Sequence, residues 1–174
     1  GQDLLLPPER IYDTYQEMFQ REAKLPDGVR MDFVSIVTPN NLHYPVAVAA
    51  LEAGFHGVCD KPMTMSIEEA RDLERNVQET KMLFCLTHNY TGYPMVKEAR
   101  DLINDEGFGS VRKVVVEYAQ GWLANNIEST GHKQAAWRTD PQLVGASTSM
   151  GDLGTHCENL TEYITGHRIT ELCA

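Results

Sequence analysis

The chain has 174 residues, of which 42% are hydrophobic and 23% charged, a balance typical of a soluble globular protein and not of a disordered one. Its formal net charge is -10 and it contains no lysine or arginine run, so we expect no nucleic-acid partner. No apolar stretch reaches the roughly 20 residues that span a bilayer, and an acidic surface argues against docking on anionic membranes because like charges repel. We therefore expect no membrane partner either.

An amphipathic helix is expected near the start of the chain. Pro8 suits the first turn of a helix, where the N–H that proline lacks would have no intrahelical partner. Ile11, Tyr15 and Phe19 then recur at helical spacing, and the turn at residues 26–28 ends the segment.

Three short apolar strands alternate with two helices in the next part of the chain. The strands are predicted at about residues 33–37, 57–59 and 82–87, and the helices at about 42–53 and 66–80. This order is typical of a parallel sheet whose strands are joined by right-handed helical crossovers. We therefore predict a doubly wound α/β domain with helices on both faces of the sheet.

Local signals support the ends of these two helices. Gly54 stands where a helix C-cap belongs, because glycine adopts the left-handed conformation readily. Ser66 followed by Glu69 matches a capping box at the start of the second helix.

The pattern changes after Asn89. A helix at 93–104, a strand at 111–119, a loop at 121–149, a helix from about Met150 to Ile164 and a strand at 169–173 are predicted. A domain boundary is therefore placed near Gly109. It separates residues 1–109 from residues 110–174, which we interpret as the beginning of an α+β domain.

The four cysteines show no C-x-x-C pair and no metal-finger spacing. This predicts reduced thiols in a cytoplasmic protein and no metal site. Cys59 and Cys85 lie inside apolar runs, so buried packing is expected for both.

Two turns each follow the carboxyl end of a predicted strand, Thr38-Pro39-Asn40-Asn41-Leu42-His43 and Asp60-Lys61-Pro62. Open α/β sheets bind ligands outside these strand ends, so both turns are expected to line one crevice. In the first turn, polar side chains and helix-start amides could contact a ribose or a phosphate. The alternative is that Asn40 or Asn41 only caps the following helix.

Lys61 precedes a proline and is therefore held on a stiff backbone at a strand end. In a partly desolvated crevice its ammonium group could polarise a carbonyl or hydroxyl oxygen. The alternative is an ordinary solvated surface lysine.

Asp152 and His156 are four residues apart, a spacing that puts both on one face of a helix. A carboxylate beside an imidazole fixes its tautomer and suits general acid–base chemistry. The alternatives are an aspartate that interacts with the helix dipole beside a solvated histidine, and a metal site for which no third ligand is evident.

Together these elements resemble the Gfo/Idh/MocA family of sugar and polyol dehydrogenases. The resemblance rests on Asp32, Ile36-Val37-Thr38-Pro39-Asn40, His43, Ala53-Gly54, Asp60-Lys61-Pro62 and Gly151-Asp152-Leu153-Gly154-Thr155-His156. It implies a Rossmann-type sheet followed by the start of an α+β substrate domain. It further implies an NAD- or NADP-dependent dehydrogenase that acts on a small sugar or polyol and forms a homo-oligomer at full length.

The resemblance also implies roles for individual residues. The expected catalytic residues are Lys61, Asp152 and His156, and the expected cofactor-binding residues are Thr38, Pro39, Asn40, His43, Asp60, Lys61 and Asn89. Trp137 and Arg138 lie where the family's substrate-facing loop runs, and they join the catalytic residues as expected substrate contacts. An ordinary aromatic–arginine packing contact is the alternative for that pair.

The chain departs from the family pattern in three respects. Asp60 stands where most members have glutamate, no arginine occurs near Thr91, and the opening strand with its G-x-G-x-x-G turn is not among the 174 residues. We therefore expect the sequence to be a central part of the family's chain. The alternatives to a dehydrogenase are an NAD-assisted glycoside hydrolase or lyase on the same scaffold and a non-catalytic binding module.

Overall fold

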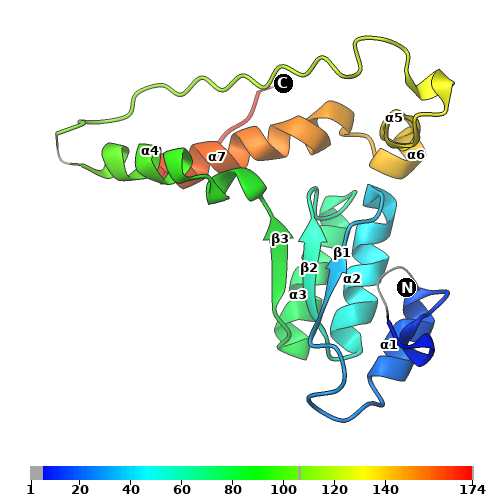
Figure 1. Cartoon of the computed structure of the whole chain (residues 1–174). Helices are drawn as coiled ribbons and strands as arrows, with labels where there is room; N and C mark the ends of the chain where they lie inside the picture. Colours follow the sequence, from blue (N-terminus) through cyan, green and yellow to red (C-terminus); the bar gives the residue numbers. More distant parts are fainter. Residues whose placement is uncertain (1–5, 106, 174) are drawn as a thin grey trace. The chain divides into compact units, whose positions relative to one another are not determined.

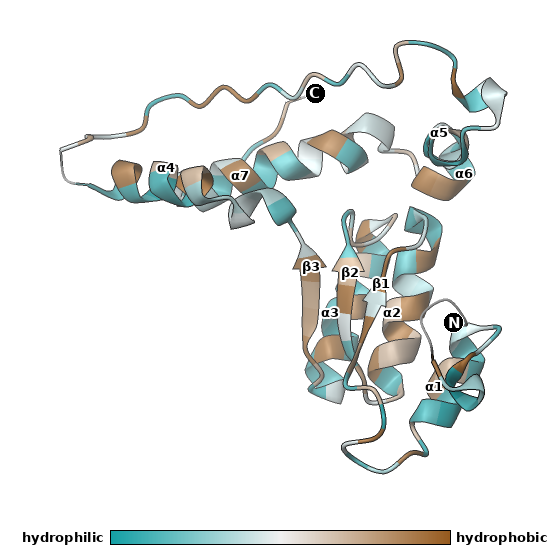
Figure 2. Cartoon of the chain, in the orientation of Figure 1, coloured by the Kyte–Doolittle hydropathy of each residue, from teal (hydrophilic) through white to brown (hydrophobic). Residues whose placement is uncertain are grey.

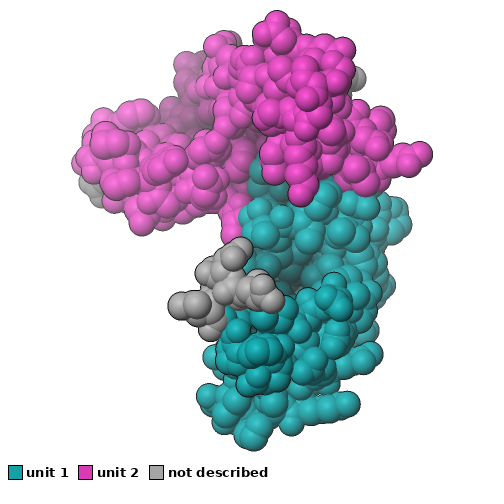
Figure 3. Space-filling view, turned by 45° about the vertical axis from the view of Figure 1, so that its right-hand side comes forward, with its two compact units in different colours: residues 1–86 teal, residues 87–174 magenta. Residues whose placement is uncertain are grey.

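The computed structural model describes residues 6–105 and 107–173. The chain forms two compact units, Gly1–Leu86 and Thr87–Ala174, which Figure 3 distinguishes by colour and which are described separately below. The domain boundary expected near Gly109 falls inside the second unit and stays a prediction for the whole protein.

A parallel sheet forms the centre of the first unit. Its strands are β1 (Phe33–Ile36), β2 (His56–Asp60) and β3 (Phe84–Thr87), in the order β1-β2-β3, and their arrows point the same way in Figure 1. In the register of the first pair, Phe33 lies opposite His56 and Ile36 opposite Cys59. Helices α2 (His43–Glu52) and α3 (Ile67–Thr80) connect the strands, so the predicted alternation of strands and helices is confirmed.

Both connecting helices cover the same face of this sheet. Ile36 and Cys59 on the covered face are buried, whereas Phe33 on the opposite face is 57% exposed. The expectation of helices on both faces is therefore wrong for the described residues. Two right-handed crossovers that advance in one direction across a sheet place both helices on one side, and only a reversal of strand order covers the other.

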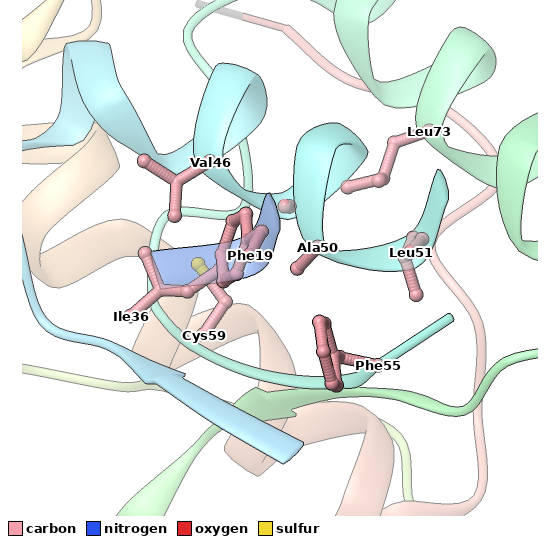
Figure 4. Close-up of a cluster of buried hydrophobic side chains, with 9 residues drawn as sticks. Phe19, Ile36, Val46, Ala50, Leu51, Phe55, Cys59 and Leu73 are labelled. Carbon is pink, nitrogen blue, oxygen red and sulfur yellow. The ribbon is translucent and has the colours of Figure 1, made fainter. Parts of the chain in front are cut away.

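The hydrophobic core lies between the covered face and the helices. Figure 4 shows its side chains, and Figure 2 shows hydrophobic residues along the strands and on α2 and α3. Ala47 and Ala50 are completely buried, because small side chains let α2 approach the sheet closely. The cluster consists of Phe19, Ile36, Val46, Ala47, Ala50, Leu51, Phe55, Cys59 and Leu73.

The two cysteines of the sheet differ in burial. Cys59 is completely buried as expected, and its burial, with a smaller effect from the charge of Asp60, raises the pKa of its thiol to about 12. Cys85 is exposed, so the expectation that it packs in the core is wrong. Successive side chains of a strand point to opposite faces, and Cys85 lies on the face that α2 and α3 leave open.

The local signals at the helix ends are confirmed. The Ser66 hydroxyl accepts a hydrogen bond from the backbone N–H of Glu69 at 3.2 Å, and the Glu69 carboxylate accepts one from the N–H of Met65 at 3.0 Å. Gly54 follows α2 with a φ of 82°, in the left-handed region that favours glycine.

The first helical segment is interrupted, in contrast to the single helix expected there. A 3₁₀ turn, η2 (Pro8–Arg10), ends at Ile11, which is extended, and helix α1 spans Tyr15–Glu22. The side chain of Thr14 caps α1 by accepting a hydrogen bond from the N–H of Glu17 at 3.1 Å. This threonine cap restarts the helix.

A buried carboxylate ties the N-terminal segment to the unit. Glu22 is 2% exposed and accepts hydrogen bonds from Arg10 at 2.9 and 2.7 Å, from the Tyr12 hydroxyl at 2.7 Å and from the Met31 N–H at 3.0 Å. Burial by itself raises the pKa of Glu22, but the hydrogen bonds from Arg10, Tyr12 and Met31 outweigh this and hold the pKa below its usual range.

Replacing Glu22 with glutamine should lower the free energy of unfolding by about 2 kcal/mol at neutral pH, because charged hydrogen bonds are lost. The folded-state pKa of Glu22 lies below the unfolded value, so its stabilisation is complete above about pH 5 and disappears as pH falls through the folded pKa. Urea unfolding at several pH values should show the difference shrinking in acid. Glu17→Gln, which breaks only the exposed pair with Arg21, should change stability little at any pH.

Among its described residues after Thr87, the regular secondary structure of the second unit is all helical. Helix α4 (Pro94–Asn104) is as predicted, and Gly166, with a φ of 70°, ends the last helix as expected. The region expected to be a loop contains three short helices, η5 (Glu128–Thr130), α5 (Lys133–Arg138) and α6 (Pro141–Val144).

The strands expected at residues 111–119 and 169–173 are absent from the described part of this unit. Val114, Val115 and Val116 are 43%, 69% and 41% exposed. A strand exists only where a neighbouring strand pairs with its backbone, and no segment among the described residues pairs with either stretch. Among all the residues that the structure describes, no helix combines the length and apolarity needed to cross a membrane.

Candidate active site

The first candidate turn follows β1 and leads through a 3₁₀ turn, η3 (Asn40–Leu42), into α2. Thr38 and Pro39 are half-buried and Asn40 is buried. The residues that cap η3 and α2 are Pro39 and Leu42, and neither cap makes a side-chain hydrogen bond. Because the helix proper begins only at His43, the alternative in which an asparagine caps it is wrong.

Two polar atoms of this turn could each form a hydrogen bond with a bound molecule. The hydroxyl oxygen of Thr38 and the side-chain oxygen of Asn41 are buried and have no hydrogen-bond partner among the residues that the structure describes. An unsatisfied buried polar atom costs about 1–3 kcal/mol, which a bound hydroxyl or amide group could recover.

His43 is turned inward. Its side chain is 1% exposed, with Nδ1 2.7 Å from the carbonyl oxygen of Pro62 and Nε2 2.9 Å from that of Thr38. Both ring nitrogens therefore face backbone oxygens of the two candidate turns.

The second candidate turn follows β2. Asp60, the last residue of the strand, is exposed, and Lys61 is half-buried, joined to Pro62 by a cis peptide bond. Asn89, at the start of the 3₁₀ turn η4 (Asn89–Gly92) that follows β3, is exposed.

Asp152 and His156 lie on either side of a change in helix type. Asp152 is half-buried in a π-helical turn, η6 (Met150–Gly154), and His156 is the second residue of α7 (Thr155–Thr165), where it is 7% exposed. The sequence predicted one regular helix here. Single π-turns occur frequently at functional sites.

Aromatic rings surround His156 within the second unit. The ring centroid of Tyr90 lies 4.5 Å from that of His156, and those of His88 and Tyr118 lie 5.9 and 6.3 Å away. The Tyr90 and Tyr118 hydroxyls are hydrogen-bonded to each other. No pattern in the sequence singles out these tyrosines, because 28 residues separate them along the chain.

The environment of Tyr90 keeps its phenol protonated. The hydrogen bond with Tyr118, burial and nearby negative charge, including that of Asp152, raise the pKa of Tyr90 to about 12. The group beside the His156 ring is therefore a neutral hydroxyl throughout the physiological pH range.

Trp137 and Arg138 end α5 and pack on each other. The guanidinium carbon of Arg138 lies 4.2 Å from the Trp137 ring centroid and 5.8 Å from that of Trp122. The indole N–H of Trp137 donates to the Gln134 side chain at 3.2 Å. Aromatic–arginine packing is therefore present, and a contact with substrate stays a prediction.

Both units match models of known protein families. Residues 9–88 match the model of an oxidoreductase family with an NAD-binding Rossmann fold, GFO_IDH_MocA, and residues 96–174 match the GFO/IDH/MocA C-terminal domain. The chain belongs to the Gfo/Idh/MocA family. The predicted family and the Rossmann-type parallel sheet are thereby confirmed.

Relatives in this family include oxidoreductases of sugars and polyols. An uncharacterized oxidoreductase of Bacillus subtilis, YfiI, is 34% identical over 94% of this chain and 41% of its own length. Levoglucosan dehydrogenase of Pseudarthrobacter phenanthrenivorans is 31% identical over 80% of this chain and 34% of its own.

An inositol dehydrogenase homolog from Azotobacter vinelandii has been solved in two complexes. The structure with NAD+ has a TM-score of 0.88 at 37% identity, over 95% of this chain and 42% of its own. The structure with NADH and myo-inositol has a TM-score of 0.83 at 35% identity, over 96% of this chain and 41% of its own. The chain thus spans less than half the length of these relatives.

The first candidate turn fits the nicotinamide cofactor that the family implies. Its unsatisfied Thr38 and Asn41 oxygens stand beyond the carboxyl end of β1, where α/β sheets of this type bind nucleotides. A ribose hydroxyl can both donate and accept a hydrogen bond, which matches the hydroxyl of Thr38 and the acceptor oxygen of Asn41.

Proposed function

We propose that this chain is part of a dehydrogenase that transfers a hydride between NAD or NADP and a hydroxyl-bearing carbon of a sugar, polyol or related small molecule. The main support is the similarity to the homolog bound to NADH and myo-inositol, which extends over 96% of this chain. The unsatisfied oxygens of the turn after β1 add support from the chain itself.

In this proposal His156 acts as the general base that takes the proton from the substrate hydroxyl, and the bound nicotinamide supplies the hydride acceptor. The ring of Tyr90, 4.5 Å from that of His156 between centroids, limits the rotation of the imidazole. Asp152 orients the imidazole or the substrate hydroxyl. A base held in one orientation loses less entropy when the reacting geometry forms.

Lys61 stabilises negative charge that develops on the substrate oxygen while the proton leaves. Thr38, Pro39, Asn40, Asp60 and Asn89 are the proposed cofactor contacts, and Trp137 with Arg138 the proposed substrate contacts. The shorter Asp60 carboxylate, in place of the glutamate of most members, is the proposed contact to the cofactor ribose.

Replacing Tyr90 with leucine should lower kcat by about 2- to 10-fold, because an aromatic pair contributes about 0.5–1.5 kcal/mol and the His156 ring would lose this support. Tyr90→Phe keeps the ring and should stay close to the wild-type kcat. Steady-state kinetics at saturating substrate compare the two variants. Equal losses of kcat in the two variants would show that the Tyr90 hydroxyl, and not its ring, supports catalysis.

The direct test is to follow NADH or NADPH formation by the full-length protein with a panel of inositols, aldoses and anhydro sugars. Reduction of cofactor in proportion to oxidised product supports the proposal. Cleavage of a glycoside without net NADH would instead identify a hydrolase or lyase that uses the cofactor transiently. Cofactor binding without turnover of any compound would favour the binding module.

The cytoplasmic location is proposed on the four free cysteines, which suit a reducing compartment. The homo-oligomer expected at full length stays a prediction.

A further inference from the structure

The imidazole of His43 spans two turns that are distant in sequence. Thr38 is two residues beyond the end of β1 and Pro62 is two residues beyond the end of β2, and one carbonyl from each turn faces a different nitrogen of the same ring. The two strands are parallel neighbours, so their carboxyl ends lie side by side. A single side chain thus joins the backbones of the two candidate turns.

The burial of His43 keeps water away from both contacts of its ring. At 1% exposure, water cannot replace either contact without opening the turns. A neutral imidazole can donate from one nitrogen and the imidazolium from both, so at least one of the two hydrogen bonds holds in either protonation state. Removing the imidazole would therefore leave at least one of the two carbonyl oxygens without its hydrogen-bond donor.

We propose that His43 is a positioning residue that locks the turn after β1 to the turn after β2 and so sets the place of Lys61 relative to Thr38. This role differs from the direct cofactor contact that the resemblance to the family implies for His43. The lock itself follows from the geometry, whereas its effect on cofactor binding and catalysis rests on the proposed function.

The same substitution at another histidine of the first unit provides a matched control. His56, at the start of β2, accepts a hydrogen bond from the N–H of Leu83 at 3.0 Å, so His56→Phe also removes a backbone contact between neighbouring segments. It acts at the opposite end of the sheet from the two turns. Two amides report on the turns, Leu42 N–H, bonded to the Pro39 carbonyl at 3.0 Å, and Met65 N–H, bonded to the Glu69 carboxylate at 3.0 Å.

Hydrogen exchange of the full-length protein tests the lock without any assay of activity. In His43→Phe both reporter amides should exchange about tenfold faster than in the wild type, the effect expected from the loss of one buried hydrogen bond. In His56→Phe only the Leu83 amide should accelerate. Unchanged exchange at both reporters in His43→Phe, or acceleration in one turn alone, would overturn the proposal.

If His43→Phe does not fold, wild-type protein labelled with ¹⁵N-histidine keeps the proposal testable. A His43 ring N–H that exchanges slowly with solvent supports a closed lock, and one that exchanges as fast as that of the exposed His167 overturns it.

The affinity of the two variants for NAD or NADP tests the proposed function separately from the lock. His43→Phe should raise the Kd of the cofactor about tenfold and lower kcat, while His56→Phe should change neither. Faster exchange in both turns with an unchanged cofactor Kd would leave the lock standing and remove the cofactor role of these turns.

Discussion

Replacing Lys61 with methionine should lower kcat by about 100- to 1,000-fold while the protein stays folded. Methionine keeps most of the unbranched apolar stem and removes the ammonium group, which in the proposed mechanism stabilises the developing oxyanion. Removal of one well-placed donor of this kind costs about 3–4 kcal/mol of transition-state stabilisation. The half-buried position of Lys61, between the end of β2 and Pro62, is consistent with an ammonium group held in place.

Steady-state kinetics and a thermal unfolding curve of the full-length variant make this measurement. The matched control is Lys24→Met, which removes a charge from an exposed position after α1 in the same unit and should leave kcat unchanged. A variant at position 61 with wild-type activity would contradict the catalytic assignment and favour the non-catalytic alternative.

Replacing His156 with asparagine should lower kcat for substrate oxidation by about 100- to 10,000-fold, the range that a general base contributes. Asparagine retains hydrogen-bonding groups but cannot serve as a base near neutral pH. The wild-type rate should decline on the acid side as the base takes up a proton, and this decline should disappear from the residual activity of the variant.

A pH–rate profile of both proteins at saturating cofactor provides the measurement. His167→Asn is the control, since His167 is an exposed histidine just beyond α7 in the same unit. An acid limb that persists unchanged in the His156 variant would assign the base to another residue.

The parts of the fold that could be predicted from the sequence rest on short-range signals. The capping box of Ser66 and Glu69 and the left-handed Gly54 need only their immediate neighbours, and both were predicted correctly. The three apolar strands were also recognisable, because each is a short run of apolar and β-branched residues bounded by turn residues.

The sequence is misleading where a structural feature depends on a partner that is distant along the chain. The alternation at residues 111–119 satisfies the pattern of a strand, yet no strand among the described residues pairs with it. Cys85 stands in an apolar run, but which face of β3 is covered depends on the path of α2 and α3. The π-turn that contains Asp152 leaves no periodic signal that distinguishes it from an α-helix over so few residues.

The sequence by itself determined the order of strands and helices in the first unit and the two turns that follow strand ends, because both depend on composition and spacing along the chain. It also pointed to the family, through the resemblance of its motifs. Only the tertiary structure decided that His43 points inward to Thr38 and Pro62, that Tyr90 and Tyr118 surround His156, and that α2 and α3 share one face of the sheet. These features join residues that are distant in sequence, and packing decides which of them meet.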